Sequence, residues 1–251
     1  MTAEIVDDEE YLSALRDKMR IRTALIGVES FSEEGLSAAN KQWNPSGQKM
    51  VETIQKIQEK GILVLASFIC GLESDTPASL KALRRYASEC GACLAQFTIY
   101  CPLPGTKDYH EMIKDLVHLE TPGYVRKHQS GILKQKFWLN PGHRTEGLHF
   151  AKISREELLR ENTACWNAYY STREILRRTR SGVGKSWPLA GKISYFMLCL
   201  VFKRVYAGHG VAADSVHRGK SGVVTKALIK VGVTLYSAFF QKKRVALRVR
   251  A

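Results

Sequence analysis

Residues Ala24-Leu-Ile-Gly-Val-Glu-Ser-Phe-Ser-Glu33 are the most informative part of the chain, because an apolar run ends there in Gly, Glu and Ser. Two further stretches have the same form: Gly61-Ile-Leu-Val-Leu-Ala-Ser-Phe-Ile-Cys-Gly71 and Gln96-Phe-Thr-Ile-Tyr-Cys-Pro-Leu-Pro-Gly-Thr106. Segments of helical character separate the three. Short apolar runs that alternate with helices are typical of parallel strands in a βα barrel, whose functional residues follow the carboxyl ends of the strands. The sequence therefore predicts a parallel sheet with a candidate site at these three ends.

Capping signatures and apolar spacing predict the helices and strands on either side of these runs. Before the loop that begins at Cys101 we expect strands over 2–6, 21–28, 62–70 and 93–100, and helices over 8–19, 45–60 and 76–90, with a short helix from Ser32. After it we expect a short helix over 110–119, an irregular connection over 121–150, a long helix over 154–180, and amphipathic helices over 188–206 and 223–244. Crossovers of this length favour parallel pairing of the strands.

Composition is that of a globular protein of one or two domains, with 251 residues and 45% apolar residues. The first residues are acidic and carry no secretory signal, and no run reaches the ~18 apolar residues of a membrane-spanning helix. Six cysteines without an export signal suit a reducing compartment. We therefore expect a cytoplasmic protein.

Positive charge is concentrated in the last third of the chain. Residues 171–251 contain 17 Lys/Arg and 2 Asp/Glu, whereas residues 1–170 contain 21 and 22. This asymmetry indicates an anionic partner, and the apolar residues beside the bases over 188–250 favour the inner face of a membrane. Nucleic acid ranks lower, because the bases are not interleaved with aromatic residues for stacking. A solvated basic tail without a partner is the alternative.

Three motifs carry a resemblance to a known family: Gly27-Val-Glu-Ser30, Phe68-Ile-Cys-Gly-Leu-Glu-Ser-Asp-Thr76 and Cys101-Pro-Leu-Pro-Gly-Thr106. In order and spacing they resemble the fourth, fifth and sixth strand ends of radical S-adenosylmethionine enzymes, and residues 1–6 are similar to the third strand. Glu73 and Ser74 stand where the family has Pro-Gly, and Cys101 where it has Thr. Residues 167–178 resemble the tail of the cobalamin-binding branch, which includes the anaerobic magnesium-protoporphyrin ester cyclase and hopanoid-modifying types.

The resemblance implies a fold and a division of the chain. The fold class is α/β, a partial TIM-like βα barrel (strands three to six) followed by an α-helical extension. Residues 1–110 form the partial barrel, 111–180 a linker with the long helix of the extension, and 181–251 a basic amphipathic region. A half barrel has unpaired edges at its first and last strands, which invites aggregation. We therefore expect a split or truncated product that begins within strand three, or one that needs a partner chain.

The resemblance also implies cofactors. Enzymes of this family cleave S-adenosylmethionine reductively at a 4Fe-4S cluster, and the branch named above adds cobalamin. The chain has no CxxxCxxC, the triad that holds the cluster in the family. A missing N-terminal half or a partner chain would carry the cluster, and this chain alone would be inactive. The alternative is a non-enzymatic protein that binds an anionic membrane surface through its basic helices.

The resemblance places S-adenosylmethionine on residues of the three strand ends, while no metal ligand or catalytic residue is assigned. Glu29 would bond a ribose hydroxyl or the ligand's ammonium group, with helix capping as the alternative, and Ser30 would add a weaker contact. Ile69 would form an apolar wall for adenine, and Gly71 would allow close approach; ordinary strand packing is the alternative for both. A rigid loop would cover the mouth of the barrel unless it is a simple turn; its residues are Pro102, Pro104, Gly105 and Thr106.

Three other patterns are expected to be structural. Asp75 and Thr76 are expected to cap the following helix. Cys90-Gly-Ala-Cys93 lacks a second pair at zinc spacing, so it is expected to cap a helix and open a strand. Gly182-Val-Gly-Lys-Ser186 is similar to the end of a phosphate-binding loop. That motif needs Gly where this chain has Thr179, and it follows a strand, whereas the segment before it here is helical. These two differences exclude the motif.

Overall fold

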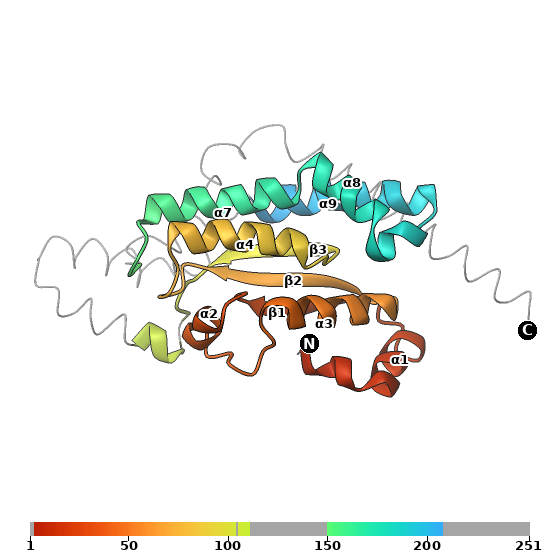
Figure 1. Ribbon diagram of the computed structural model, residues 1–251, viewed down its shortest axis with the longest axis horizontal. Coiled ribbons are helices and arrows are strands. Elements are labelled where there is room, and N and C mark those ends of the chain that lie inside the picture. The colour runs from red at the N-terminus through yellow and green to blue at the C-terminus, as the bar shows by residue number, and fades with distance from the viewer. Residues whose placement is uncertain (1–2, 104, 111–149, 208–251) are drawn as a thin grey trace, which may run out of the picture.

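A computed structural model describes residues 3–103, 105–110 and 150–207 and contains a three-stranded parallel sheet in the order β1-β2-β3 (Figure 1). The strands are β1 (Thr23–Glu29), β2 (Leu63–Cys70) and β3 (Leu94–Ile99). Three of the expected strands are therefore confirmed to within two residues. The fold is mixed α/β, and the three parallel strands of the described part of the chain are consistent with a partial barrel.

Helices connect the strands as the sequence predicts. α2 (Glu33–Ala38) and α3 (Gly47–Glu59) link β1 to β2, and α4 (Pro77–Glu89) links β2 to β3. α3 buries the apolar stripe Met50, Val51, Ile54 and Ile57. In α4 the Thr76 hydroxyl accepts from the Ser79 N–H in a capping box, and Pro77 opens the helix. The expected capping role of Thr76 is therefore confirmed.

The segment expected as a first strand is instead a 3-10 helix, η1 (Ala3–Asp7), followed by α1 (Glu9–Asp17). The Asp8 carboxylate accepts from the Tyr11 N–H at 2.7 Å and caps α1. The acidic run over 7–10 suits the positive end of a helix, so the helical start extends back over residues that in isolation suit a short strand. The described sheet thus begins at β1, and the strand over 2–6 was a wrong prediction.

The long helix expected over 154–180 is two helices, α7 (Arg155–Tyr169) and α8 (Thr172–Arg180). Ser154 and Glu157 form the predicted capping box of α7. The break follows because Ser171 caps α8, its hydroxyl accepting from the Glu174 N–H at 3.3 Å. A 3-10 turn, η4 (Gly182–Ser186), then leads to α9 (Leu189–Tyr206), close to the expected bounds. The helices expected over 110–119 and 223–244, and the connection expected over 121–150, lie outside the described residues except for His110 and Phe150.

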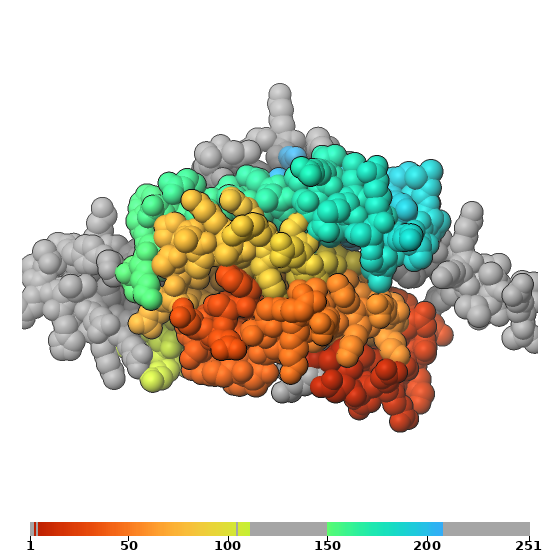
Figure 2. Space-filling model, in the orientation of Figure 1, coloured from red at the N-terminus to blue at the C-terminus, as the bar shows by residue number. Residues whose placement is uncertain are grey.

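One hydrophobic core joins the sheet to the helices that follow it. α4 and α7 lie side by side in Figure 1 and pack closely on each other, while α3 packs on β2. Figure 2 shows α7, α4 and α3 in this order down one face of the molecule. Phe68 of β2 and Phe97 of β3 are stacked with ring centroids 5.5 Å apart, and Trp166 of α7 meets Phe97 edge-on at 5.6 Å. Tyr195 and Cys199 bring α9 into the same core.

The outer edge of β3 is covered by side chains of the following helices. In a parallel strand every second residue directs both its backbone polar groups to one side. The Ala95 N–H donates to the Tyr170 hydroxyl at 3.0 Å, and that hydroxyl donates to the Ala95 carbonyl at 2.7 Å. The Phe97 carbonyl accepts from Asn162 Nδ2 and from Trp166 Nε1, both at 3.1 Å.

The same edge continues to Cys93, whose carbonyl accepts from the Tyr195 hydroxyl of α9 at 2.5 Å. The expectation of an open edge at the last strand is therefore wrong at Cys93, Ala95 and Phe97. Side-chain donors on α7 and α9, together with Tyr170 between α7 and α8, satisfy backbone groups that a further strand would otherwise pair.

Candidate functional site

The carboxyl ends of the three parallel strands lie at one edge of the sheet, where Glu29, Cys70 and Ile99 end β1, β2 and β3. A hollow of about 350 Å³ lies beyond the ends of β2 and β3. Apolar side chains form much of its wall, with a few polar groups between them. Its lining includes Ile69, Thr98, Ile99, Pro102, Thr106 and Asp108. Concave sites of this mixed character are typical of small-ligand binding.

Three of the expected site residues, Ile69, Pro102 and Thr106, meet in this hollow. The Thr106 hydroxyl donates to the Leu103 carbonyl at 2.7 Å and accepts from the Tyr109 N–H at 3.2 Å. Thr106 therefore holds the turn and the start of the next helical segment. Gly105 has φ of +90°, a backbone conformation that favours glycine. Pro104 lies outside the described residues.

Two polar residues of the hollow were not anticipated from the sequence. The Tyr100 hydroxyl donates to Asp108 Oδ2 at 2.6 Å, which links the end of β3 to the segment after the Pro/Gly loop. The two residues lie on opposite sides of that loop and share no helix or strand, so sequence spacing gives no signal for this contact.

Glu29 occupies an irregular turn of backbone at the end of β1. Its φ is +63°, and the register with β2 shifts between Gly27 and Glu29. The carboxylate folds back over Gly27, where any Cβ would collide with Glu29 Oε1. Burial raises the pKa of the Glu29 carboxyl, and the charge of Lys41 partly opposes that rise. The N-terminus of α2 is capped by Ser32, whose hydroxyl accepts from the Gly35 N–H at 3.1 Å.

Ser30 and Gly71 lie against protein. Ser30 is 7% exposed, and its hydroxyl accepts from the Ser32 N–H at 3.3 Å. Gly71 has φ of +92°, and a Cβ there would lie 2.9 Å from both Leu158 and Phe150. The Gly71 N–H donates to Asp75 Oδ2 at 2.8 Å, so Asp75 holds the turn that contains Glu73 and Ser74. Glu29, Ser30 and Gly71 are not among the residues that line the hollow at β2 and β3.

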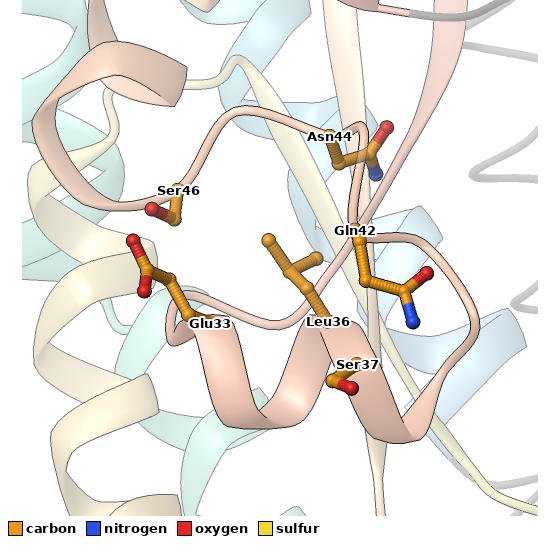
Figure 3. Close-up of a pocket in the computed structure, with 6 residues that line it drawn as sticks. All are labelled: Glu33, Leu36, Ser37, Gln42, Asn44 and Ser46. Carbon is orange, nitrogen blue, oxygen red and sulfur yellow. The ribbon is translucent and has the colours of Figure 1, made fainter.

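A second hollow of about 350 Å³ lies between α2 and the loop that leads to α3 (Figure 3). Glu33, Leu36 and Ser37 line it from α2, and Gln42, Asn44 and Ser46 from the loop. Asn44 Nδ2 also donates to the Gly27 carbonyl at 2.8 Å, which ties the loop to the end of β1. Sequence reasoning did not indicate this hollow, because its polar residues have no spacing typical of a known site.

The described residues contain no group of three or more His, Cys, Asp or Glu side chains arranged to hold a metal ion. Cys90 is the C-cap of α4, and Cys93 directly precedes β3. Burial raises the pKa of the Cys90 thiol to about 11 and that of the Cys93 thiol to about 12. The structural role predicted for this pair is confirmed.

Replacing Glu29 with Gln is expected to increase stability more at pH 7 than at pH 4. A carboxyl whose pKa is raised on folding stabilises the protein while it is protonated, and this contribution is lost as the pH rises through the folded-state pKa. Because the group is only partly buried, the gain at pH 7 should be ~0.5 kcal/mol. Urea unfolding at the two pH values measures it. Glu33→Gln is the control, and an equal gain at both pH values for Glu29→Gln would contradict the assignment.

Comparison with known proteins gives two partial matches. Residues of this chain are 32% identical over 85 residues to an uncharacterized methyltransferase of Pyrococcus horikoshii, covering 34% of this chain and 18% of that protein. They are 28% identical over 109 residues to the anaerobic magnesium-protoporphyrin IX monomethyl ester cyclase of Rubrivivax gelatinosus, covering 43% of this chain and 19% of the cyclase. The chain thus matches less than a fifth of the length of either relative. No protein-family model matches it.

Proposed function

We propose that this chain is part of a radical S-adenosylmethionine enzyme and contributes about half of the cofactor pocket. The observation that carries this proposal is the hollow at the carboxyl ends of β2 and β3, in which Ile69 and Pro102 meet as the motifs predict. The partial match to a cyclase of the type that the tail resembles supports it. The match to a protein named as a methyltransferase is consistent with an S-adenosylmethionine-related family.

The hollow fits one end of S-adenosylmethionine by the character of its wall. Ile69, Ile99 and Pro102 offer apolar surface for adenine, while Thr98 and Asp108 add polar groups at the rim. Glu29, at the end of the neighbouring strand, would accept a hydrogen bond from a ribose hydroxyl or from the ligand's ammonium group. Ser30 and Gly71 then act by shaping the turns after β1 and β2, because both lie against protein.

A 4Fe-4S cluster does not fit the residues of this chain. The sequence has no CxxxCxxC, and the described part has no cluster of three metal-ligating side chains. We therefore propose that a missing N-terminal half or a partner chain holds the cluster, together with cobalamin if the whole enzyme uses it. This chain would bind and orient the cofactor, and would not generate a radical by itself.

Binding of S-adenosylmethionine to the purified chain tests the proposal. With half of the contacts present, we expect saturable but weak binding, of the order of 1 mM. Ile69→Asp should weaken it at least tenfold, because an ionised carboxylate would replace the apolar wall. The matched control is Leu176→Asp on α8, which changes the same charge at a partly exposed apolar position.

Two results would contradict this function. The first is binding that Ile69→Asp and Leu176→Asp weaken equally, because the hollow would then have no role. The second is formation of 5′-deoxyadenosine by the chain alone after reconstitution with iron and sulfide, because the chain would then carry the whole activity.

A further inference from the structure

Helix α9 carries apolar residues on two of its sides, and within the described part of the chain only one of these sides is covered. On the covered side Tyr195 and Cys199 are buried, and the Phe202 ring lies 6.3 Å from Trp166 and 6.0 Å from Tyr170. On the other side Leu189 is 74% exposed, Ile193 50% and Leu200 38%. These three residues recur at helical spacing and form one stripe, which we call the outer stripe.

The hydrogen bonds on the covered side of α9 fix the direction in which the outer stripe points. The Tyr195 hydroxyl donates to the Cys93 carbonyl at 2.5 Å and accepts from Arg178 Nε at 2.7 Å. Rolling α9 inward to bury the outer stripe would break both bonds and leave buried polar groups without partners. The exposed stripe is therefore a property of the folded protein.

The charge around α9 selects the kind of partner. Residues 175–207 contain seven Lys/Arg and no Asp or Glu. Two exposed bases flank the outer stripe in the sequence: Lys185 lies in η4, just before α9, and Arg204 lies in the last turn of α9. A second copy would bring basic surface against basic surface, and so would residues 223–244 of this chain, which carry Lys226, Lys230 and Lys242–Arg244. Like charges at such short range are unfavourable.

We propose that α9 lies flat on an anionic bilayer, with the outer stripe in the headgroup boundary and the flanking bases on lipid phosphates. A helix of this kind binds through apolar area together with attraction to anionic lipid. None of the helices in the described ranges is long and apolar enough to cross a membrane. This proposal does not depend on S-adenosylmethionine, so the two can fail separately.

Co-sedimentation of the full chain with lipid vesicles tests it. We expect binding to vesicles with ~30% phosphatidylglycerol in phosphatidylcholine, and at least tenfold weaker binding to phosphatidylcholine alone. The double variant Ile193→Glu/Leu200→Glu should weaken binding to the anionic vesicles at least tenfold. The matched control is Tyr11→Glu/Trp43→Glu, which adds the same charge at residues that are 49% and 57% exposed outside α9.

The comparison between the two double variants distinguishes lipid binding through the outer stripe from binding through the net charge of the protein. Equal losses in both would overturn the proposal, because net charge alone would then explain binding. Unchanged binding in Ile193→Glu/Leu200→Glu would overturn it as well, with residues 208–251 as the lipid contact. A concentration-dependent dimer in sedimentation velocity that Ile193→Glu/Leu200→Glu abolishes, without vesicle binding, would assign the stripe to a second copy. Circular dichroism of each variant checks that it is folded.

Discussion

Replacing Tyr170 with Phe is expected to lower the free energy of unfolding by about 2–4 kcal/mol, although only one oxygen atom is removed. That oxygen accepts from the Ala95 N–H and donates to the Ala95 carbonyl on the outer edge of β3. Both backbone groups are buried, and a buried donor or acceptor without a partner costs about 1–3 kcal/mol. The ring itself keeps its contacts with Trp166 and Phe202 in the variant, so packing should be unchanged.

Urea unfolding measures this effect, and hydrogen exchange at the Ala95 amide locates it. Tyr11→Phe is the control, because it removes the same oxygen atom from a residue that is 49% exposed. The exchange rate of Ala95 should rise by more than that of amides in β2. A change in stability as small as that of the control would mean that the Tyr170 hydroxyl does not close the edge of β3.

Replacing Arg178 with Ala should cost about 3 kcal/mol, because a charged side chain is 6% exposed at the junction of α7, α8 and α9. Its Nε donates to the Tyr195 hydroxyl at 2.7 Å and its Nη2 to the Tyr169 carbonyl at 2.9 Å. The guanidinium also lies 4.0 Å from the centre of the Tyr169 ring. Loss of these contacts should loosen α9 as well as α8.

Two variants show which part of Arg178 matters. Arg178→Met keeps much of the volume and removes the buried charge, so it should cost less than Arg178→Ala. Arg177→Ala is the control. The ion pair of Arg177 with Glu174 and its hydrogen bond to the Ser88 carbonyl are both exposed, so their loss should cost less than about 1 kcal/mol. Thermal or urea unfolding compares the three variants. If Arg178→Ala were no worse than Arg177→Ala, the buried contacts would contribute no net stability.

The strands were predictable because each is an apolar run that ends in residues unsuited to a strand. The prediction of a strand over 2–6 was wrong because five residues fit either a short strand or a helical turn. The acidic run that follows favours the helix. The break between α7 and α8 was missed because the Ser171–Glu174 signature lies within a longer helical pattern. Trp166 and Tyr170 lie within the helix predicted over 154–180, and the periodicity of that helix gave no sign of their hydrogen bonds to β3.

The candidate site was predictable only in part. Parallel strands end at one edge of the sheet, which brings Ile69 and Pro102 together as expected. The positive φ of Glu29 was not foreseen, because that conformation is uncommon for residues other than glycine. Gly71 was assigned to the ligand, but its close neighbours come from Phe150 and Leu158 in the later part of the chain. Such long-range packing cannot be predicted from the local sequence.

The covering of β3 also sets an order of events during synthesis. Phe97 is made 65 residues before Asn162 and 69 before Trp166, and Cys93 is made 102 residues before Tyr195. Chains emerge N-terminal end first, so the edge of β3 lacks these partners until much of the helical part has appeared. A nascent chain halted between β3 and α7 would present bare strand edge to its neighbours. Pausing in that interval would therefore expose the protein to misassembly.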